Sequence, residues 1–334
     1  MGSQRYKFGN VKPNDILKFT KEELSGGKSL VGYTIDSIDG AITAFKNENP
    51  LGIGISSISS NGTIKVISSV LDLSSLTVGS TFTLGKYQVE SETPWPIEWE
   101  IVHQTNDYQI AMTKQIIDMR CFDAKEPNNP DSNIKSDGNN NWQYSNIEQF
   151  LNSDQSNWYS AQHQYDAPPN KDNCWYYENG TTYNAYDTHK GFLYYFSDEE
   201  KNLLKDITFD LYSYDIKSSY TWTGKVWLPT YTQMSGKLNN KISEGTKFDK
   251  YSDDNSRIKT LHPNCTANNE YCKINNITEG TARVYWMSSG VFSNSCSSYY
   301  VNLHGNPEFS ITPYRGLIGL APCICLPKTG EFWS

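Results

Sequence analysis

Residues that could act as acids, bases or metal ligands are scattered along this chain rather than grouped. Five histidines have neither metal-ligand nor triad spacing, so surface or packing roles are expected. They are His103, His163, His189, His262 and His304. Asp253 and Asp254 could form the carboxylate pair of a glycosidase, but their setting, KYSDDNSR, is typical of a solvated turn. We therefore expect no enzyme, with a wall-glycan hydrolase as an alternative.

Two short motifs are similar to ligand sites but lack the context that those sites require. Residues 26–29 (GGKS) match the end of a phosphate-binding loop, yet Glu22 stands where the first glycine belongs and no strand precedes it. Residues 126–128 (EPN) equal the sugar-selecting triplet of calcium-dependent lectins, but they lie far from the C-terminal loop in which those lectins carry it. We therefore expect no cofactor and no bound metal.

The segment 290–318 has the chemistry of a ligand-binding surface. Tyr, Ser, Gly and Asn dominate it, with Arg315 as its one arginine. Aromatic rings supply contact area at low entropic cost, and small polar side chains supply adaptable hydrogen bonds. The candidate ligand-binding residues are Val291, Phe292, Ser295, Ser297, Ser298, Tyr300, Asn302, His304, Asn306, Phe309, Ser310, Thr312, Tyr314, Arg315 and Leu317.

The same part of the chain is depleted in five residue types that are common elsewhere. From Ser288 to Leu326, only Glu308 belongs to the group Glu, Lys, Gln, Met and Trp. One explanation is that a β-rich segment full of Gly and Ser disfavours long charged side chains. The other explanation depends on a family resemblance, given below.

Strands are expected to hold this segment at both ends. Residues 284–286 form a short aromatic strand, and the apolar run 319–326 is typical of a buried strand. Between them, alternation from Tyr299 through Val301 to Leu303 predicts another strand, followed by a turn at 305–307.

The middle of the chain predicts a hairpin and two modest helices. Residues 95–102 alternate as a strand, with 108–112 as its hairpin partner. Ser145 is the expected N-cap of a helix at 146–151, with Glu148 completing a capping box. Ser197, with Glu200 three residues on, marks a second helix in the same way. Residues 122–142 are expected to be a polar loop without core residues. Few helices, several strands and long loops predict an α+β domain over residues 86–330.

Residues 4–85 predict a separate β-rich module. Short runs rich in Ile and Val alternate there with Gly, Ser and Asn, as in a small sandwich or barrel. We expect this module to serve attachment or oligomerisation.

Charge and hydropathy exclude several partners. A net charge of −8, with no basic run, argues against nucleic acid. No apolar stretch reaches membrane-spanning length, and the N-terminus has no signal-peptide core. We therefore expect no membrane insertion and synthesis in the cytoplasm.

Seven cysteines are scattered without zinc spacing or a dense disulfide framework. Reduced structural thiols are expected, with a Cys265–Cys272 bridge as an alternative.

From about residue 80 to 328, the order of short motifs resembles a bacterial and phage domain family of unassigned function. Each motif is weak alone, but the ordered set is fairly specific. The motifs are GKYQ (85–88), Ile97, Trp99 and Ile101, the helix with Trp142, Ser145, Ile147, Phe150, Leu151 and Asn152, FSDEEK (196–201), KVWLP (225–229), and finally Tyr285, Trp286, Ser289, Tyr300, Val301, Gly305, Gly319 and Pro322.

The closing pattern also resembles the C-type-lectin-like fold of the formylglycine-generating-enzyme type, as used by variable proteins of diversity-generating retroelements. The resemblance implies a hypervariable ligand site in the C-terminal domain. It also implies codon randomisation that never yields Glu, Lys, Gln, Met or Trp, the five depleted types. Glu308 would then be unvaried, as would the framework residues Tyr285, Trp286, Gly305, Pro322 and Leu326.

Together these features predict a receptor-binding or adhesin-like display protein on a phage tail (virion) or the bacterial cell surface. Its expected partners are a cell-surface protein or glycan receptor and, through residues 4–85, a larger virion or surface assembly, with a homotrimer as one arrangement. A surface or structural protein that is not diversified is the main alternative.

Overall fold

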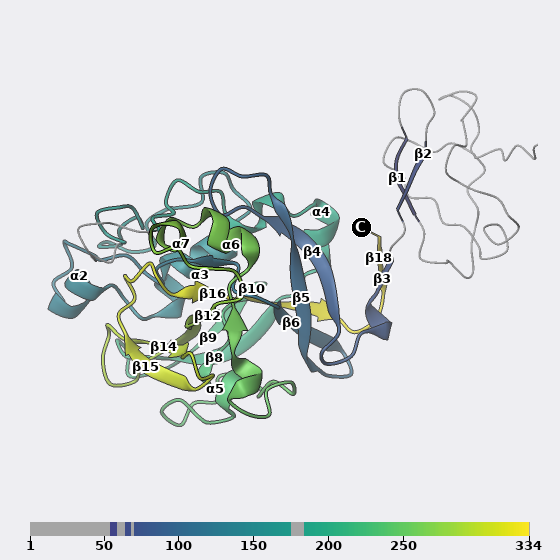
Figure 1. Cartoon of the computed structure of the whole chain (residues 1–334). Helices are drawn as coiled ribbons and strands as arrows, with labels where there is room; N and C mark the ends of the chain where they lie inside the picture. Colours follow the sequence, from purple (N-terminus) through teal and green to yellow (C-terminus); the bar gives the residue numbers. More distant parts are fainter. Residues whose placement is uncertain (1–53, 59–63, 68–69, 175–183, 334) are drawn as a thin grey trace, which may run out of the picture. The chain divides into compact units, whose positions relative to one another are not determined.

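The computed structural model describes residues 54–58, 64–67, 70–174 and 184–333, and it divides the chain into two compact units (Figure 1). One unit is Met1–Ser75 with Thr329–Ser334, and the other is Leu76–Lys328. The division falls earlier than the expected boundary after residue 85, because that boundary lies within a strand of the larger unit. Most of the expected N-terminal module lies outside the described residues.

The described residues of the smaller unit form two antiparallel strand pairs and one 3₁₀ turn. The final residues of the chain return to it, because β18 pairs with β3. Its elements are β1 (Gly54–Ile58) with β2 (Ile64–Ile67), β3 (Val70–Asp72) with β18 (Glu331–Trp333), and η1 (Leu73–Ser75).

The first sheet of the larger unit has the order β10-β17-β6-β5-β4. Its strands are β4 (Thr81–Tyr87), β5 (Trp95–Gln104), β6 (Tyr108–Thr113), β10 (Val226–Trp227) and β17 (Cys323–Pro327). The predicted β5–β6 hairpin is confirmed. Alternate residues of β5, namely Trp95, Ile97, Trp99 and Ile101, are buried, because side chains along a strand point to opposite faces.

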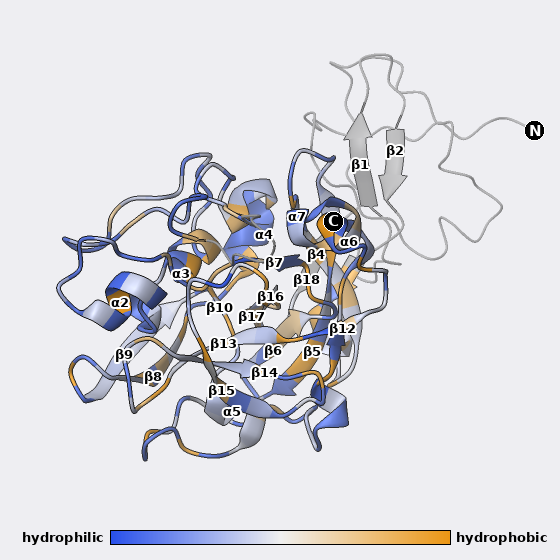
Figure 2. Cartoon of the chain, turned by 60° about the vertical axis from the view of Figure 1, so that its left-hand side comes forward, coloured by the Kyte–Doolittle hydropathy of each residue, from blue (hydrophilic) through white to orange (hydrophobic). Residues whose placement is uncertain are grey.

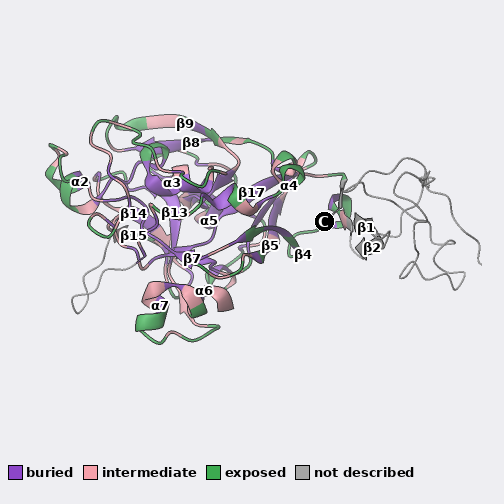
Figure 3. Cartoon of the chain, turned by 90° about the horizontal axis from the view of Figure 1, so that it is seen from above, coloured by how far each residue is buried: buried purple, intermediate pink, exposed green. Residues whose placement is uncertain are grey.

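The second sheet has the order β15-β14-β13-β16-β7 and carries the segment of interest. Its strands are β7 (Asp118–Met119), β13 (Tyr285–Gly290), β14 (Ser298–Val301), β15 (Pro307–Ile311) and β16 (Gly319–Leu320). Every residue of β13 is buried, and the strand is coloured as buried along its length in Figure 3. β15 is the edge strand, paired only with β14 in this sheet.

Short helices, 3₁₀ turns and two further strand pairs surround the sheets. The helices are α2 (Ser132–Asp137), α3 (Asn146–Leu151), α4 (Asp198–Leu203), α5 (Tyr231–Ser235), α6 (Pro263–Asn268) and α7 (Glu270–Ile274). The 3₁₀ turns are η2 (Trp142–Tyr144), η3 (Phe192–Tyr195) and η4 (Asn255–Arg257), and the strand pairs are β8 (Ile207–Ser213) with β9 (Ser218–Gly224) and β11 (Lys259–Thr260) with β12 (Ala282–Arg283). This mixture of helix and sheet agrees with the expected α+β class, and hydrophilic residues dominate the long connecting loops (Figure 2).

Both predicted helix caps are present. The Ser145 side chain accepts a hydrogen bond from the Glu148 amide at the start of α3, but the expected capping box is not completed there. The Glu148 carboxyl accepts from Trp222 Nε1 (3.1 Å) instead. Ser197 and Glu200 form a complete capping box at α4. Among the helices that the structure describes, none combines the length and apolar character that crossing a bilayer requires.

The prediction of a core-free loop over residues 122–142 is wrong. Phe122 and Trp142 are buried, with ring centroids 5.9 Å apart, and the Phe122 ring lies 5.8 Å from that of Trp286 on β13. The segment is rich in polar asparagines, as a surface loop would be, but three consecutive asparagines, Asn139, Asn140 and Asn141, are buried. Buried amides are stable only where they are hydrogen-bonded.

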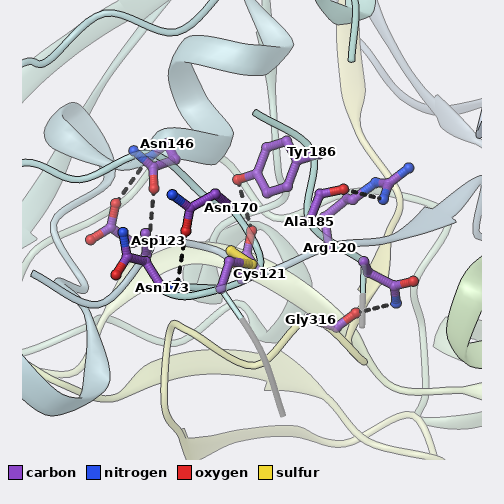
Figure 4. The surroundings of a disulfide bond; sticks show 12 residues. Arg120, Cys121, Asp123, Asn146, Asn170, Asn173, Ala185, Tyr186 and Gly316 are labelled. Carbon is purple, nitrogen blue, oxygen red and sulfur yellow. Dashed lines mark hydrogen bonds between the residues drawn. A yellow bond between two sulfur atoms is a disulfide. The ribbon is translucent and has the colours of Figure 1, made fainter. Parts of the chain in front are cut away.

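The expectation of reduced thiols is wrong for one pair, because Cys121 and Cys174 form a disulfide (Figure 4). The bond joins the end of β7 to the polar insertion that follows α3, and neighbouring hydrogen bonds reinforce the junction. Tyr186 Oη donates to the Cys121 carbonyl (3.0 Å), and the Cys174 amide donates to the Asn170 carbonyl (2.8 Å). Cys265 and Cys272, the alternative bridge, are buried free thiols.

Candidate functional site

The candidate surface is built on the β14–β15 hairpin at the edge of the second sheet (Figure 1). Tyr299 pairs with Phe309, and Tyr300 pairs with Glu308, so the two pairs point to opposite faces of the hairpin. β14 has four residues and is roughly 13 Å long. The loops at both of its ends therefore lie within reach of one bound partner.

One face of the hairpin is aromatic. The Tyr299 ring packs between Tyr231 of α5, with centroids 4.6 Å apart, and Phe309, with centroids 5.6 Å apart. Tyr299 is buried, whereas 53% of Phe309 is exposed. The outer ring is thus held in place by a buried one and still presents apolar area to solvent.

The other face is polar and centred on Glu308. Tyr300 Oη donates to Glu308 Oε2 (3.0 Å), and Asn302 Nδ2 donates to Glu308 Oε1 (2.7 Å). Glu308 therefore fixes two candidate ligand-binding side chains by accepting a hydrogen bond from each.

Two loops add exposed apolar residues at the ends of β14. Phe292, in the β13–β14 loop, is 44% exposed, and Leu303, in the β14–β15 turn, is 46% exposed. Exposed large apolar side chains that gather in one region are typical of interaction sites. With Phe309 they are the exposed large apolar side chains of this hairpin and its adjoining loop.

Asn140, from the buried asparagine run, holds the β13–β14 loop. Its Nδ2 lies 2.6 Å from the Ser297 carbonyl, 2.9 Å from the Asn294 carbonyl and 3.4 Å from the Val291 carbonyl. Its backbone amide also donates to the Ser295 carbonyl (2.9 Å). One residue, distant in sequence, thus satisfies much of the backbone of this loop.

A buried carboxyl group supports the end of β13. Glu244 Oε2 accepts from Ser289 Oγ (2.5 Å), and Glu244 Oε1 accepts from Asn239 Nδ2 (2.9 Å). Asn239 Nδ2 also reaches the Gly290 carbonyl (3.0 Å). Burial raises the pKa of Glu244 to about 7, although the hydrogen bonds from Ser289 and Asn239 oppose this rise.

The buried Arg257 side chain holds the β14–β15 turn through hydrogen bonds. Its Nε donates to the Gly305 carbonyl (2.7 Å), its Nη1 donates to the Met234 carbonyl (3.2 Å), and it forms an ion pair with Asp254. Gly305 has φ +79°, and a Cβ atom there would lie 1.7 Å from the Asp254 carbonyl oxygen. Only glycine fits this position.

The fifteen candidate residues differ in accessibility. Phe292, His304 and Phe309 are exposed; Ser297, Tyr300, Asn302, Asn306, Thr312, Tyr314, Arg315 and Leu317 are half-buried; Val291, Ser295 and Ser298 are buried; and the side chain of Ser310 is outside the described residues. None of Phe292, Tyr300, Phe309 and Tyr314 is sealed in the core.

Val291, Ser295 and Ser298 are therefore corrections to the expected surface. The Val291 amide donates to the Ser297 carbonyl (3.1 Å), and the Ser295 carbonyl accepts from the Asn140 amide (2.9 Å). Ser298 is paired on both sides, with Gly290 and with Ile311. Their side chains are buried and therefore do not contribute to the exposed surface.

Other sequence candidates do not assemble into a catalytic site. Asp253 lies in an exposed turn, where its carboxylate accepts from the Ser256 amide (2.8 Å). His262 stacks on Trp95 with centroids 3.9 Å apart, and Glu126 of the EPN triplet is a buried partner of His163 (3.2 Å). Within the described ranges, no group of three His, Cys, Asp or Glu residues is arranged to hold a metal ion.

The family model described as "Domain of unknown function (DUF6273)" matches residues 108–328. The chain belongs to this DUF6273 family. The match runs from β6 through β17 and includes the whole candidate surface, whereas β4 and β5 precede it. No curated protein and no solved structure matches the chain.

The roles of three residues at the candidate surface were not predicted from the sequence. Leu303 continues the alternation of Tyr299 and Val301 and was expected in a strand, but β14 ends at Val301 and Leu303 is exposed. Tyr231 is contributed by α5, and only the fold brings it to the hairpin. Glu308 stood out as the one residue of its depleted group, but its role as a hydrogen-bond hub had no sequence signal.

The tight turn at Gly305 gives the first prediction. Gly305→Ala should destabilise this DUF6273 protein by roughly 2 kcal/mol or more beyond the backbone strain of a positive φ, because the added methyl group meets the Asp254 backbone. The matched control is Gly280→Ala, since Gly280 has φ +76° with open space around its Cβ position. Denaturant unfolding measures both, and equal losses would contradict the clash.

The buried Glu244 gives the second prediction. In the folded state its carboxyl keeps a proton up to about pH 7, whereas its ordinary pKa of 4.5 applies on unfolding. The folded state therefore binds more protons between these values, and this group makes the free energy of unfolding fall as pH rises through that window. Glu244→Gln should remove up to about 1.4 kcal/mol per pH unit from that slope.

Urea unfolding at several pH values between about 5 and 8 measures this slope. Some slope should remain in the variant, because burial also raises the pKa of Glu148 to about 7. Glu279→Gln, at an exposed glutamate, is the control and should retain the wild-type profile. An unchanged slope in Glu244→Gln would show that this carboxyl does not hold its proton.

Proposed function

We propose that this protein is a non-enzymatic display protein whose β14–β15 hairpin and adjoining loops bind a receptor on a cell surface. The observation that carries the proposal is the exposure of Phe292, Leu303 and Phe309 beside a completely buried β13. A fixed strand with exposed apolar side chains on its neighbours can change its ligand contacts without altering its core.

The residues that hold the backbone of this segment are different from those that are exposed on it. Asn140, Glu244 and Arg257 are buried, and their hydrogen bonds go to backbone groups or to the side chains of Ser289, Asn239 and Asp254. None of these bonds involves the side chain of Phe292, Leu303 or Phe309. Substitutions at Phe292, His304 or Phe309 therefore leave these anchors intact. This separation is what a surface with exchangeable residues requires.

We place the larger unit with C-type-lectin-like domains of the formylglycine-generating-enzyme type, in the role of a retroelement-diversified variable protein of a phage tail or bacterial surface. The depletion of Glu, Lys, Gln, Met and Trp between Ser288 and Leu326 supports diversification. Oligomerisation, as a homotrimer, and attachment belong to the N-terminal module in this proposal.

The direct test is binding of the fluorescently labelled full chain to a panel of bacterial cells and to a glycan array. The double variant Leu303→Ser/Phe309→Ser should lose about tenfold or more of the binding, because apolar anchors dominate such interfaces. The matched control is Val78→Ser/Ile216→Ser, which removes two exposed apolar side chains elsewhere in the larger unit.

Circular dichroism should show that both double variants are folded, since all four residues are exposed. Equal binding by the two variants would remove the hairpin as the ligand surface. Failure of the unmodified chain to bind any cell or glycan probe would count against the receptor-binding role.

Diversification makes a separate prediction about sequences. Close siblings of this chain should differ mainly within residues 290–318, and there mainly at exposed or half-buried positions. Val291, Ser295, Ser298, Gly305 and Glu308 should stay constant, because each has a supporting role in the structure. Sequencing sibling genes and their neighbourhood measures this, and differences spread evenly along the chain would contradict diversification.

A further inference from the structure

A cavity of about 330 Å³ lies in the larger unit, away from the residues of the display surface. It is formed where the end of β4 and the following turn meet the segment before η3. Its lining includes Gln88, Glu90, Ser91, Thr188, His189 and Lys190. This volume falls near the lower end of the roughly 300–1,000 Å³ range of small-molecule sites.

Glu90 presents a carboxylate to this cavity with its hydrogen-bonding capacity only partly used. Its Oε2 lies 3.5 Å from His189 Nε2, and its Oε1 lies 3.7 Å from Arg120 Nη2. These distances are at or beyond the limit of a hydrogen bond. Two carboxylate oxygens offer about four acceptor sites, so Glu90 can accept further bonds from a ligand.

The groups behind Glu90 keep it ionised and oriented. Burial alone would raise the pKa of Glu90, but the contact with His189 and the charge of Arg120 more than offset burial, and the pKa lies below its ordinary value. Arg120 is fully buried and is fixed by Asp118, since its Nε donates to Asp118 Oδ2 (2.7 Å). The acceptor is therefore preorganised before any ligand arrives.

The orientation of the His189 ring is set by Arg120. Arg120 Nη2 lies 3.1 Å from His189 Nδ1, and because a guanidinium can only donate, Nδ1 must accept. The proton of the neutral ring then resides on Nε2, which faces Glu90. Arg120 thus fixes the ring through Nδ1, and the Nε2 proton is directed toward Glu90.

Groups around the cavity supply donors as well as acceptors. Ser91 and Thr188 carry exposed hydroxyls, and the Lys190 ammonium lies over the rings of Tyr194 (4.3 Å) and Tyr195 (4.9 Å). Lys190 balances the charge of Glu90 within the cavity. A lining of mixed hydrogen-bonding groups, with one carboxylate and one ammonium, suits a neutral polar ligand.

A larger hollow of about 730 Å³ adjoins the cavity and shares Glu90, Ser91, Thr188 and His189 with it. Its additional charged residues are also of both signs: Asp172, Asp187 and Glu270 with Lys171 and Lys273. The hollow can therefore accommodate a continuation of a ligand that is held in the smaller cavity.

We propose that this cavity binds a neutral, hydroxyl-rich ligand, namely a single sugar residue of a glycan. Glu90 accepts hydrogen bonds from its hydroxyl groups, and Ser91, Thr188 and Lys190 bond to the remaining oxygens. The proposal does not rest on the display function, because it uses none of the residues of the β14–β15 hairpin.

The test is titration of the full chain with methyl glycosides of glucose, galactose, mannose and N-acetylglucosamine, by ligand-observed NMR and calorimetry. At least one sugar should bind in the millimolar range. Glu90→Gln should weaken binding about tenfold or more, because it removes a charged acceptor. Thr188→Tyr should abolish binding by filling the cavity from an exposed position, without altering the Arg120 contacts.

Thr83→Tyr is the matched control, because Thr83 is an exposed threonine on β4 that does not line either hollow. It should bind sugar like the unmodified chain. Free lysine and inorganic phosphate serve as charged comparison probes. The proposal would be overturned if no sugar bound, if Thr188→Tyr bound as well as Thr83→Tyr, or if a charged probe bound in preference to all four sugars.

Discussion

Hydrogen bonding of buried polar groups is the constraint on which the candidate surface depends. β13 is buried throughout, and the carbonyls of the loop that leaves it are bonded from within the protein. The Asn140 amide bonds to three of these carbonyls, although it has only two protons to donate. Arg257 donates in the same way to the Gly305 carbonyl of the hairpin turn, and Glu244 accepts from the Ser289 hydroxyl at the end of β13. Anchors contributed from distant parts of the chain thus determine which side chains of the segment remain outside.

The fold was predictable where its causes are local. Alternation identified β5 and β6, and the side chains of Ser145 and Ser197 identified the starts of α3 and α4. Each of these signals operates within a few residues. The Cys121–Cys174 disulfide joins positions 53 residues apart, and only the path of the intervening insertion brings them together. The burial of Asn140 was missed for the same reason, since the carbonyls to which it donates lie in the last fifth of the chain.

The candidate site was predictable in composition but not in detail. Residue types indicated the segment 290–318, and its exposed aromatic residues agree with that interpretation. Which serine faces inward could not follow from type alone, because Ser295 and Ser298 differ from Ser297 only in how Asn140 and the neighbouring strands enclose them. The cavity at Glu90 had no sequence signal, since its groups come from separate segments joined through Arg120.

The pairing of β18 with β3 makes the larger unit an insertion within the smaller one. The chain leaves the first unit after Ser75 and re-enters it at Thr329, where the Leu73 amide bonds the Gly330 carbonyl (2.9 Å). The final residues are consequently an integral strand and not a dispensable tail. Trimming them, or fusing a bulky tag directly to them, would disturb β3 although both changes lie far along the sequence from it.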